Sequence, residues 1–149
     1  MNRIVMIAAA SLTSLIGLSS TTAADKDEKK EPIVLKTKAQ LLDFVDNTKN
    51  YKGKLITLTL IYNEDKPLRQ AVDPTARFNM LDFKCNSNNV RFDINIEAGF
   101  TKERFGDAEY KKVEDLPNAK KGDDLVVTFL CDKGSLLGFN FAKKIVRDK

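Results

Sequence analysis

The sequence predicts a mainly β protein in which five strands close into a Greek-key barrel. An N-terminal helix precedes the barrel, and a short helix is expected between strands three and four. Three observations predict this fold. Five segments alternate apolar and polar residues with the two-residue period of a half-buried strand. A stretch of helical period precedes them, and a phase break in the second strand indicates a β-bulge, a feature that barrels use where a strand bends.

The first 24 residues have the pattern of a secretory signal peptide. Arg3 gives a positive start, the run Ile4 to Leu18 is apolar, and small residues follow up to Ala24. A membrane-spanning helix needs roughly 20 apolar residues, and this run is shorter and interrupted by hydroxyl side chains. We therefore expect cleavage near Ala24 and an exported protein, periplasmic or secreted, with no membrane anchor after cleavage.

Two segments are expected after the signal peptide. The segment 25–36 is predicted to be a charged, flexible lead, because its first eight residues, Asp25 to Pro32, include no apolar side chain that could be buried against a core. The segment 37–149 is predicted to be a single barrel domain, since the chain is long enough for one domain of ordinary size and too short for two.

The first predicted helix begins at Thr37. Gln40 follows three residues later, which is the spacing of a capping box. The expected apolar face carries Leu41, Leu42 and Val45, with Phe44 at its edge. This helix either covers one end of the barrel or offers a surface to a partner, and the pattern favours the first role.

The strands are predicted at 54–62, 76–85, 90–97, 124–131 and 136–146. In the second strand Phe78 and Met80 share one phase while Leu81 and Phe83 share the other, so an extra residue is expected near Met80. A short helix is predicted from Asp107 to Leu116. This layout is that of a five-stranded OB-fold barrel. A small α+β sandwich fits it less well, because a sandwich does not explain the bulge.

The composition restricts the chemistry. The chain has no histidine, which excludes Ser-His and Cys-His catalytic pairs and the usual zinc sites. No catalytic residue, metal site or cofactor is predicted. Removing the signal peptide leaves 24 basic and 21 acidic side chains, a small surplus that is spread along the chain. Such a distribution weighs against nucleic acid as a partner.

Cys85 and Cys131 are the two cysteines of the chain. Because export would bring them into a compartment where disulfides persist, the sequence favours a Cys85–Cys131 disulfide. The alternative is a pair of buried thiols that pack as small hydrophobic side chains.

Candidate binding residues come from two places. The loop 63–77 is the longest polar excursion of the chain, and barrels of this kind also bind ligands on the face of strands two and three. The ligand-binding residues predicted there are Lys66, Arg69, Gln70 and Arg77 in the loop, and Arg91 and Asn95 on the outward face of the third strand.

The chain from Tyr51 onward, about two thirds of its length, resembles the tRNA_anti-like family of small exported bacterial OB-fold proteins. The residues that carry the resemblance lie at the corners and close of the barrel: Tyr51 to Lys54, Lys120 to Asp124, Val126 to Cys131, Gly138-Phe139 and Ile145-Val146. The resemblance implies the fold. It does not imply an activity, because one fold serves many functions.

Three functions follow from these observations. The first is an exported, non-enzymatic OB-fold module that binds an unknown protein or a glycan of the cell envelope. The second is a metal-assisted hydrolase that uses Asp and Glu side chains. The third is a weak nucleic-acid binder, whose affinity would fall steeply with salt.

Overall fold

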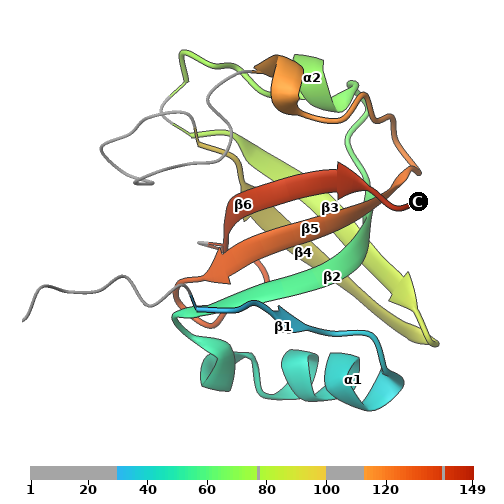
Figure 1. The fold of residues 1–149 in the computed structure, drawn as a ribbon, viewed down its shortest axis with the longest axis vertical. Coiled ribbons are helices and arrows are strands. Elements are labelled where there is room, and N and C mark those ends of the chain that lie inside the picture. Colours follow the sequence, from blue (N-terminus) through green and yellow to red (C-terminus); the bar gives the residue numbers. More distant parts are fainter. Residues whose placement is uncertain (1–29, 77, 100–112, 139) are drawn as a thin grey trace, which may run out of the picture.

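The computed structural model describes residues 30–76, 78–99, 113–138 and 140–149. The predicted signal peptide and most of the predicted helix Asp107 to Leu116 lie outside these residues. The described part is mainly β, and five of its strands close into a barrel (Figure 1). Among the described residues, no helix has the length and apolar character needed to span a membrane.

The barrel is made by the last five of six strands. The elements in chain order are β1 (Ile33–Val34), α1 (Lys38–Asp46), the 3₁₀ helix η1 (Thr48–Tyr51), β2 (Lys54–Tyr62), α2 (Leu68–Ala71), β3 (Met80–Ser87), β4 (Val90–Glu97), the 3₁₀ helix η2 (Val113–Asp115), β5 (Asp124–Cys131) and β6 (Asn140–Arg147). The strands pair in the order β1-β2-β3-β4-β6-β5, and β2 also pairs with β5, which closes the ring.

The barrel core follows from the alternation of the strands. The predicted inward positions of β2 are confirmed, because Ile56, Leu58, Leu60 and Tyr62 are all buried. Alternating residues of β3, β4 and β5 are buried with them in the same core, as a period of two requires. The strands β4 and β5 also have the predicted bounds.

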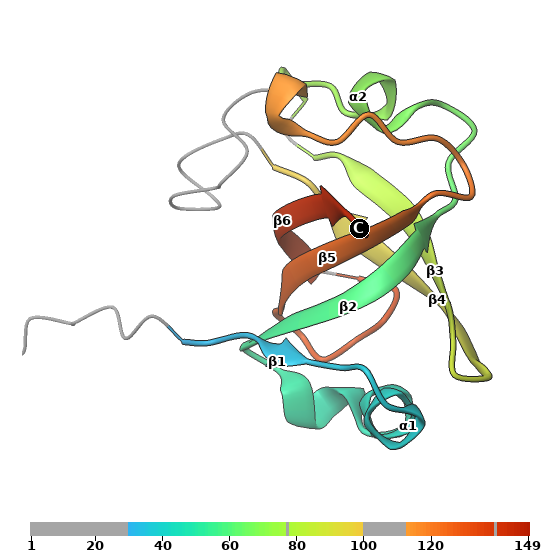
Figure 2. The ribbon, with the colours of Figure 1, turned by 45° about the vertical axis from the view of Figure 1, so that its right-hand side comes forward.

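Two seams of the barrel, where neighbouring strands pair, are narrow, because only one or two residue pairs form there. β3 and β4 pair along their whole length, whereas β2 and β3 pair only at Ile61↔Lys84 and Tyr62↔Phe83. Beyond these pairs the β3–β4 hairpin extends away from β2 (Figures 1 and 2). β1 occupies the freed edge of β2 as a parallel strand, with Ile33 opposite Ile56. The second narrow seam is a single parallel pair between β4 and β6.

The pairing of β1 corrects one prediction. Ile33 and Val34 lie inside the segment 25–36, which was expected to be a flexible lead, yet they form a strand, and the Leu35 N–H donates to the Thr57 carbonyl at 2.9 Å. The sequence could not predict this strand, because β1 pairs with an edge of β2 that is open only where β3 turns away from it.

The predicted bulge near Met80 is wrong. β3 begins at Met80 and pairs with β4 without a register shift, and both Phe78 and Met80 point outward, with 48% and 46% of their surface exposed. The irregularity lies instead between β5 and β6, where Thr128 pairs with Lys144 and Phe129 pairs with Ala142. The skipped residue, Lys143, brings both Ala142 and Ile145 into the core.

The last strand also starts later than predicted. Leu137, expected on the core face, lies in the turn before β6 and is 67% exposed, and Phe139 lies outside the described residues. Asn140 takes the buried position at the start of β6. Its side-chain amide donates to the backbone carbonyls of Asn95, Ser135 and Leu136, which fastens this turn to β4.

α1 covers one end of the barrel, which we call the α1 end (Figure 2). The predicted capping box is present, since the Gln40 N–H donates to Thr37 Oγ1 and the Gln40 side chain accepts from the Thr37 N–H. The buried face differs from the predicted one. Leu41 and Phe44 are buried while Leu42 is 40% exposed, because the helix turns its Phe44 side toward the barrel.

The opposite end of the barrel, which we call the α2 end, is covered by α2 and η2 (Figure 1). Leu68 and Leu116 are fully buried there. The Leu68 N–H donates to the carbonyl of Ala119 at 2.9 Å, so the chain after β2 is joined directly to the chain before β5.

The structure does not contain the predicted disulfide. Cys85 in β3 and Cys131 in β5 are both free thiols, and both are buried in the barrel core. Burial raises the pKa of each thiol. They pack as small hydrophobic side chains, which is the alternative that the sequence left open.

Candidate functional site

The structure divides the predicted binding residues between two places. Lys66, Arg69 and Gln70 lie in and before α2, at the α2 end of the barrel. Arg91 and Asn95 lie on β4. The sixth residue, Arg77, lies outside the described residues. The described residues are thus divided between the same two places, the loop and the strand face, from which the sequence predicts them.

Arg69 is engaged by the protein itself. Its Nε donates to the carbonyl of Leu116 at 2.8 Å and its Nη2 donates to the carbonyl of Glu114 at 3.1 Å. These carbonyls belong to η2 and the residue that follows it. Arg69 therefore joins α2 to η2 across the end of the barrel, a structural role that leaves little of the guanidinium for a ligand.

The other two residues before and in α2 offer little more. Lys66 accepts a hydrogen bond from Tyr62 Oη at its backbone carbonyl, at 2.9 Å, and lines a hollow of about 330 Å³ together with Glu64 and Asp65. The Asp65 carboxylate is paired with the Lys121 ammonium at 2.6 Å. Gln70 is exposed on α2.

A larger hollow lies at the β3–β4 hairpin, and we call it the β3–β4 hollow. It measures about 500 Å³, within the range of small-molecule sites. Its lining comes from the narrow β2–β3 seam and the neighbouring hairpin: Ile61, Lys84, Cys85, Asn86, Arg91, Phe92 and Asp93. It lies where β3 turns away from β2, so that outward residues of three strands and the core-facing Cys85 and Phe92 all reach it.

The register of the hairpin arranges the charges of this hollow. Lys84 stands opposite Asp93, and Asn86 stands opposite Arg91. Side chains directly opposite in an antiparallel pair have Cβ atoms about 5 Å apart. The hollow therefore carries two cations and one carboxylate side by side, with Ile61 next to Lys84 across the seam.

Asn95 lies farther along the same face. It is opposite Asp82 and half-buried. Its backbone is used in the fold, because its N–H donates to the Leu136 carbonyl and its carbonyl accepts from the Asn140 amide. Asn95 is thus near the β3–β4 hollow, but it does not line it.

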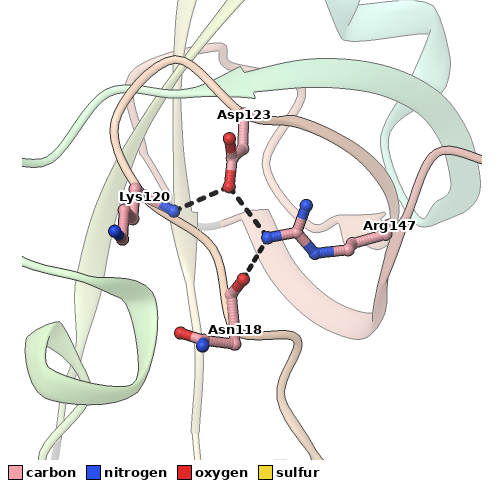
Figure 3. A network of polar contacts seen from close by, with 4 residues as sticks. All are labelled: Asn118, Lys120, Asp123 and Arg147. Carbon is pink, nitrogen blue, oxygen red and sulfur yellow. Dashed lines mark hydrogen bonds and ion pairs between the residues drawn. The ribbon is translucent and has the colours of Figure 1, made fainter.

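Arg91 is held at one nitrogen only. Its Nε donates to Asn86 Oδ1 at 3.2 Å, and within the described part of the chain its two terminal Nη groups donate to no protein atom. Arg147 contrasts with it in Figure 3. The Arg147 Nη2 donates to the Asn118 carbonyl and to Asp123 Oδ2, which also accepts from the Lys120 N–H.

The β3–β4 hollow can bind a polar ligand by hydrogen bonds and charge. Lys84 and Arg91 supply donors, Asp93 supplies acceptors, and Ile61 with half-buried Phe92 adds apolar surface. No group of three or more metal-ligating side chains gathers anywhere in the described ranges.

Sequence reasoning found Arg91 and missed Lys84, Asn86 and Asp93. The signal was present in the turn. Asn88 and Asn89 both have positive φ, at 52° and 62°, as a two-residue hairpin turn requires, and Asn is among the residues that tolerate this conformation. A two-residue turn fixes Ser87 opposite Val90, and with it Lys84 opposite Asp93. Treating 86–89 as one loop concealed this register.

Comparison with known proteins adds no assignment to this geometry. No protein-family model matches the chain, and no curated protein matches it.

Proposed function

We propose that this chain is an exported, non-enzymatic OB-fold binding module whose ligand site is the β3–β4 hollow. The single observation that carries the proposal is the hollow itself. A concavity of about 500 Å³ lies at the β3–β4 hairpin, and its lining includes Lys84, Asp93 and Arg91, whose hydrogen bond to Asn86 uses Nε alone.

The arrangement of the barrel supports the OB-fold part. The ring order β2-β3-β4-β6-β5, closed from β5 to β2, is the order of a five-stranded Greek-key barrel of this type. The helix α1 before the first barrel strand and the short η2 before β5 also support the proposal. In this fold, ligands bind on the face of the second and third barrel strands, which are β3 and β4 here.

The contrast between the two candidate places supports the location. Arg69, the central residue of the loop site, is bound to two backbone carbonyls, whereas Arg91 keeps its terminal nitrogens for a ligand. The ligand classes are those that the sequence favoured, a protein or a glycan of the cell envelope.

A capture experiment tests the site. The purified protein is immobilised and exposed to solubilised envelope proteins and to envelope glycans, and the retained components are identified by mass spectrometry. A double variant, Lys84→Glu with Arg91→Glu, reverses the charge of the hollow. The matched control, Lys52→Glu with Lys144→Glu, makes the same charge change at exposed positions outside it.

We expect the wild type and the control to retain the same components and the hollow variant to lose them. Circular dichroism of each variant checks that it is folded. If the folded hollow variant retains the wild-type set, or if the wild type retains nothing from either fraction, the proposal is wrong.

Export has its own test. Expression of the full chain in a bacterial host, followed by fractionation and intact-mass measurement, should give an extracytoplasmic protein that has lost the residues up to about Ala24. A cytoplasmic protein that retains its first residues would contradict the proposed export.

A further inference from the structure

The three described arginines differ in how much of each guanidinium the protein uses. Arg69 donates from Nε and Nη2 to backbone carbonyls, and Arg147 donates from Nη2 to a carbonyl and a carboxylate. Arg91 donates from Nε alone, to Asn86. Among the described residues, the β3–β4 hollow therefore contains the arginine with both terminal nitrogens available.

The contact with Asn86 orients this arginine. Fixing Nε at 3.2 Å from Asn86 Oδ1 restrains the guanidinium plane and leaves Nη1 and Nη2 as the free edge. Two parallel N–H groups on one edge match the two oxygens of a carboxylate, which is the bidentate pairing that Arg makes best. A restrained guanidinium also loses less side-chain freedom when the ligand binds.

The other lining residues restrict which second functional group the ligand can carry beside its carboxylate. Asp93 lies two residues from Arg91 on the same face of β4 and can accept hydrogen bonds from a ligand. A ligand ammonium at Asp93 would stand close to the Lys84 ammonium, which is directly opposite, and like charges so placed repel. A hydroxyl group donates to Asp93 without that repulsion, and it can also accept a hydrogen bond from Lys84.

Charge and size agree with such a ligand. The lining has two cations and one carboxylate, so a single negative charge on the ligand balances it. Ile61 and half-buried Phe92 supply apolar contact for the carbon face of a small ring or chain. The volume of about 500 Å³ accommodates one sugar unit or a small hydroxy acid.

From this geometry, and resting on the proposed function, we infer that the β3–β4 hollow binds a hydroxylated monocarboxylate, with the carboxylate on the Nη edge of Arg91 and a hydroxyl group on Asp93. A uronic acid residue of a glycan and a free hydroxy acid share this chemistry.

The test is a titration of the isotope-labelled protein followed by amide chemical shifts. The probes are glucuronate, an oligosaccharide that carries glucuronate, lactate, glucose, acetate and alanine. We expect saturable shifts at β3 and β4 with a hydroxylated carboxylate, and binding at least tenfold weaker for glucose, acetate and alanine. Tighter binding of glucuronate and its oligosaccharide than of lactate would indicate a glycan as the source of the ligand. Tighter binding of lactate would indicate a free hydroxy acid.

Two variants assign the roles. Arg91→Gln removes the charged fork and should weaken glucuronate or lactate binding at least tenfold, while Arg91→Lys, which keeps the charge but loses the planar fork, should recover only part of it. Asp93→Asn should reduce the preference for the hydroxylated probes over acetate. The control Lys144→Gln, outside the hollow, should leave binding unchanged.

The outcomes separate this inference from the proposed function. Envelope components that are lost with the hollow variant, together with no binding of any carboxylate probe, would overturn the inference and leave the function standing. If alanine binds as tightly as the hydroxylated probes, Asp93 accepts an ammonium group as well as a hydroxyl group, and the inference is also overturned. If the wild type retains no envelope component, the proposed function fails.

Discussion

The two ends of the barrel are closed by different forces. At the α1 end, Phe44 is fully buried and its ring contacts Tyr51, Phe92 and Phe129, with ring centroids 5.1 to 6.3 Å apart. Tyr51 meets it edge-on, an arrangement that aromatic pairs prefer. This end is closed mainly by apolar packing of a helix that is capped within its own sequence.

At the α2 end the closing elements are one turn each, too short to be stable by themselves. Arg69 joins them through the carbonyls of Glu114 and Leu116, and the Leu68 N–H bonds to Ala119. The partners lie more than 40 residues apart in the chain. The comparison shows that a self-contained helix can cover a barrel by packing, whereas two short segments need directed hydrogen bonds between them.

Removing the Phe44 ring, which is the aromatic plug of the α1 end, should have the largest effect on stability. Phe44→Ala deletes a fully buried ring at the α1 end, and we expect a loss of about 3 to 5 kcal/mol in the free energy of unfolding. Urea denaturation followed by circular dichroism measures it. The control, Leu42→Ala, removes a 40% exposed side chain from the same helix and should cost less than about 1 kcal/mol. Equal losses for both variants would mean that α1 contributes no plug.

The contact between the β5–β6 turn and η1 should come next. A Cβ at Gly134 would lie 2.7 Å from Lys49 Cα, and Gly134 has a φ of +64°. Gly122 has a φ of +93° with no atom within 4 Å of its Cβ position, so Gly122→Ala isolates the backbone cost. We expect Gly134→Ala to be less stable than Gly122→Ala by about 1 to 3 kcal/mol in the same urea experiment. Equal stability would show that η1 yields freely.

Loosening the α2 end should cost less than removing the plug. Arg69→Gln loses both carbonyl contacts, and because this side chain is exposed we expect about 1 to 2 kcal/mol. Hydrogen exchange should also speed up in the residues around Leu116. Arg91→Gln, the same substitution at an arginine with one contact, should change stability by no more than about 0.5 kcal/mol. A larger loss for Arg91→Gln would reverse the roles given to the two arginines.

The smallest effect concerns the pH dependence of the α1 end. Burial and the hydrogen bond to Asp43, at 2.6 Å, raise the pKa of Tyr51 to about 12. The pKa is higher in the folded state than the usual value near 10, so the stabilisation is complete below pH 10 and is lost as the pH rises to about 12. The same contact lowers the pKa of Asp43, so that contribution is present above about pH 4 and is lost on acidification.

Tyr51→Phe should therefore flatten the dependence of unfolding free energy on pH between 10 and 12. At the α2 end, Tyr62 is fully buried and its pKa is also raised, chiefly by burial. Its stabilisation is therefore also lost above pH 10, so Tyr51→Phe should remove only the Tyr51 part of the slope, and Tyr62→Phe should leave that part in place. The measurement is urea denaturation at a series of pH values. An unchanged pH profile in Tyr51→Phe would show that the Tyr51–Asp43 contact does not stabilise the α1 end.

The sequence predicted most of the barrel because its strands carry local information. The alternation of β2, β4 and β5 gave their inward residues, and Thr37 with Gln40 gave the start of α1. The failures have a common cause. The predicted strand 76–85 shows a phase break because it includes Phe78, which precedes β3, whereas β3 itself alternates regularly from Met80. The bulge at Lys143 lies in another strand, β6, and only its pairing with β5 reveals it.

For the candidate site, the sequence indicated which residue types could bind a ligand. It did not indicate which of these side chains the fold leaves free. Arg69 and Arg91 look equally available in the sequence, since one is predicted in a polar loop and the other on the outward face of a strand. Only the approach of η2 engages Arg69, and only the hairpin register sets Lys84, Asn86 and Asp93 beside Arg91.

The sequence by itself determined the class of fold, the start of the first helix and the composition that lacks histidine, because period, capping and side-chain type are local properties of the chain. The tertiary structure decided which edge of β2 received β1, that the two cysteines are free thiols and which arginine kept its terminal nitrogens. These depend on the approach of segments that are distant in the chain, and such approaches are set by the packing of the whole barrel.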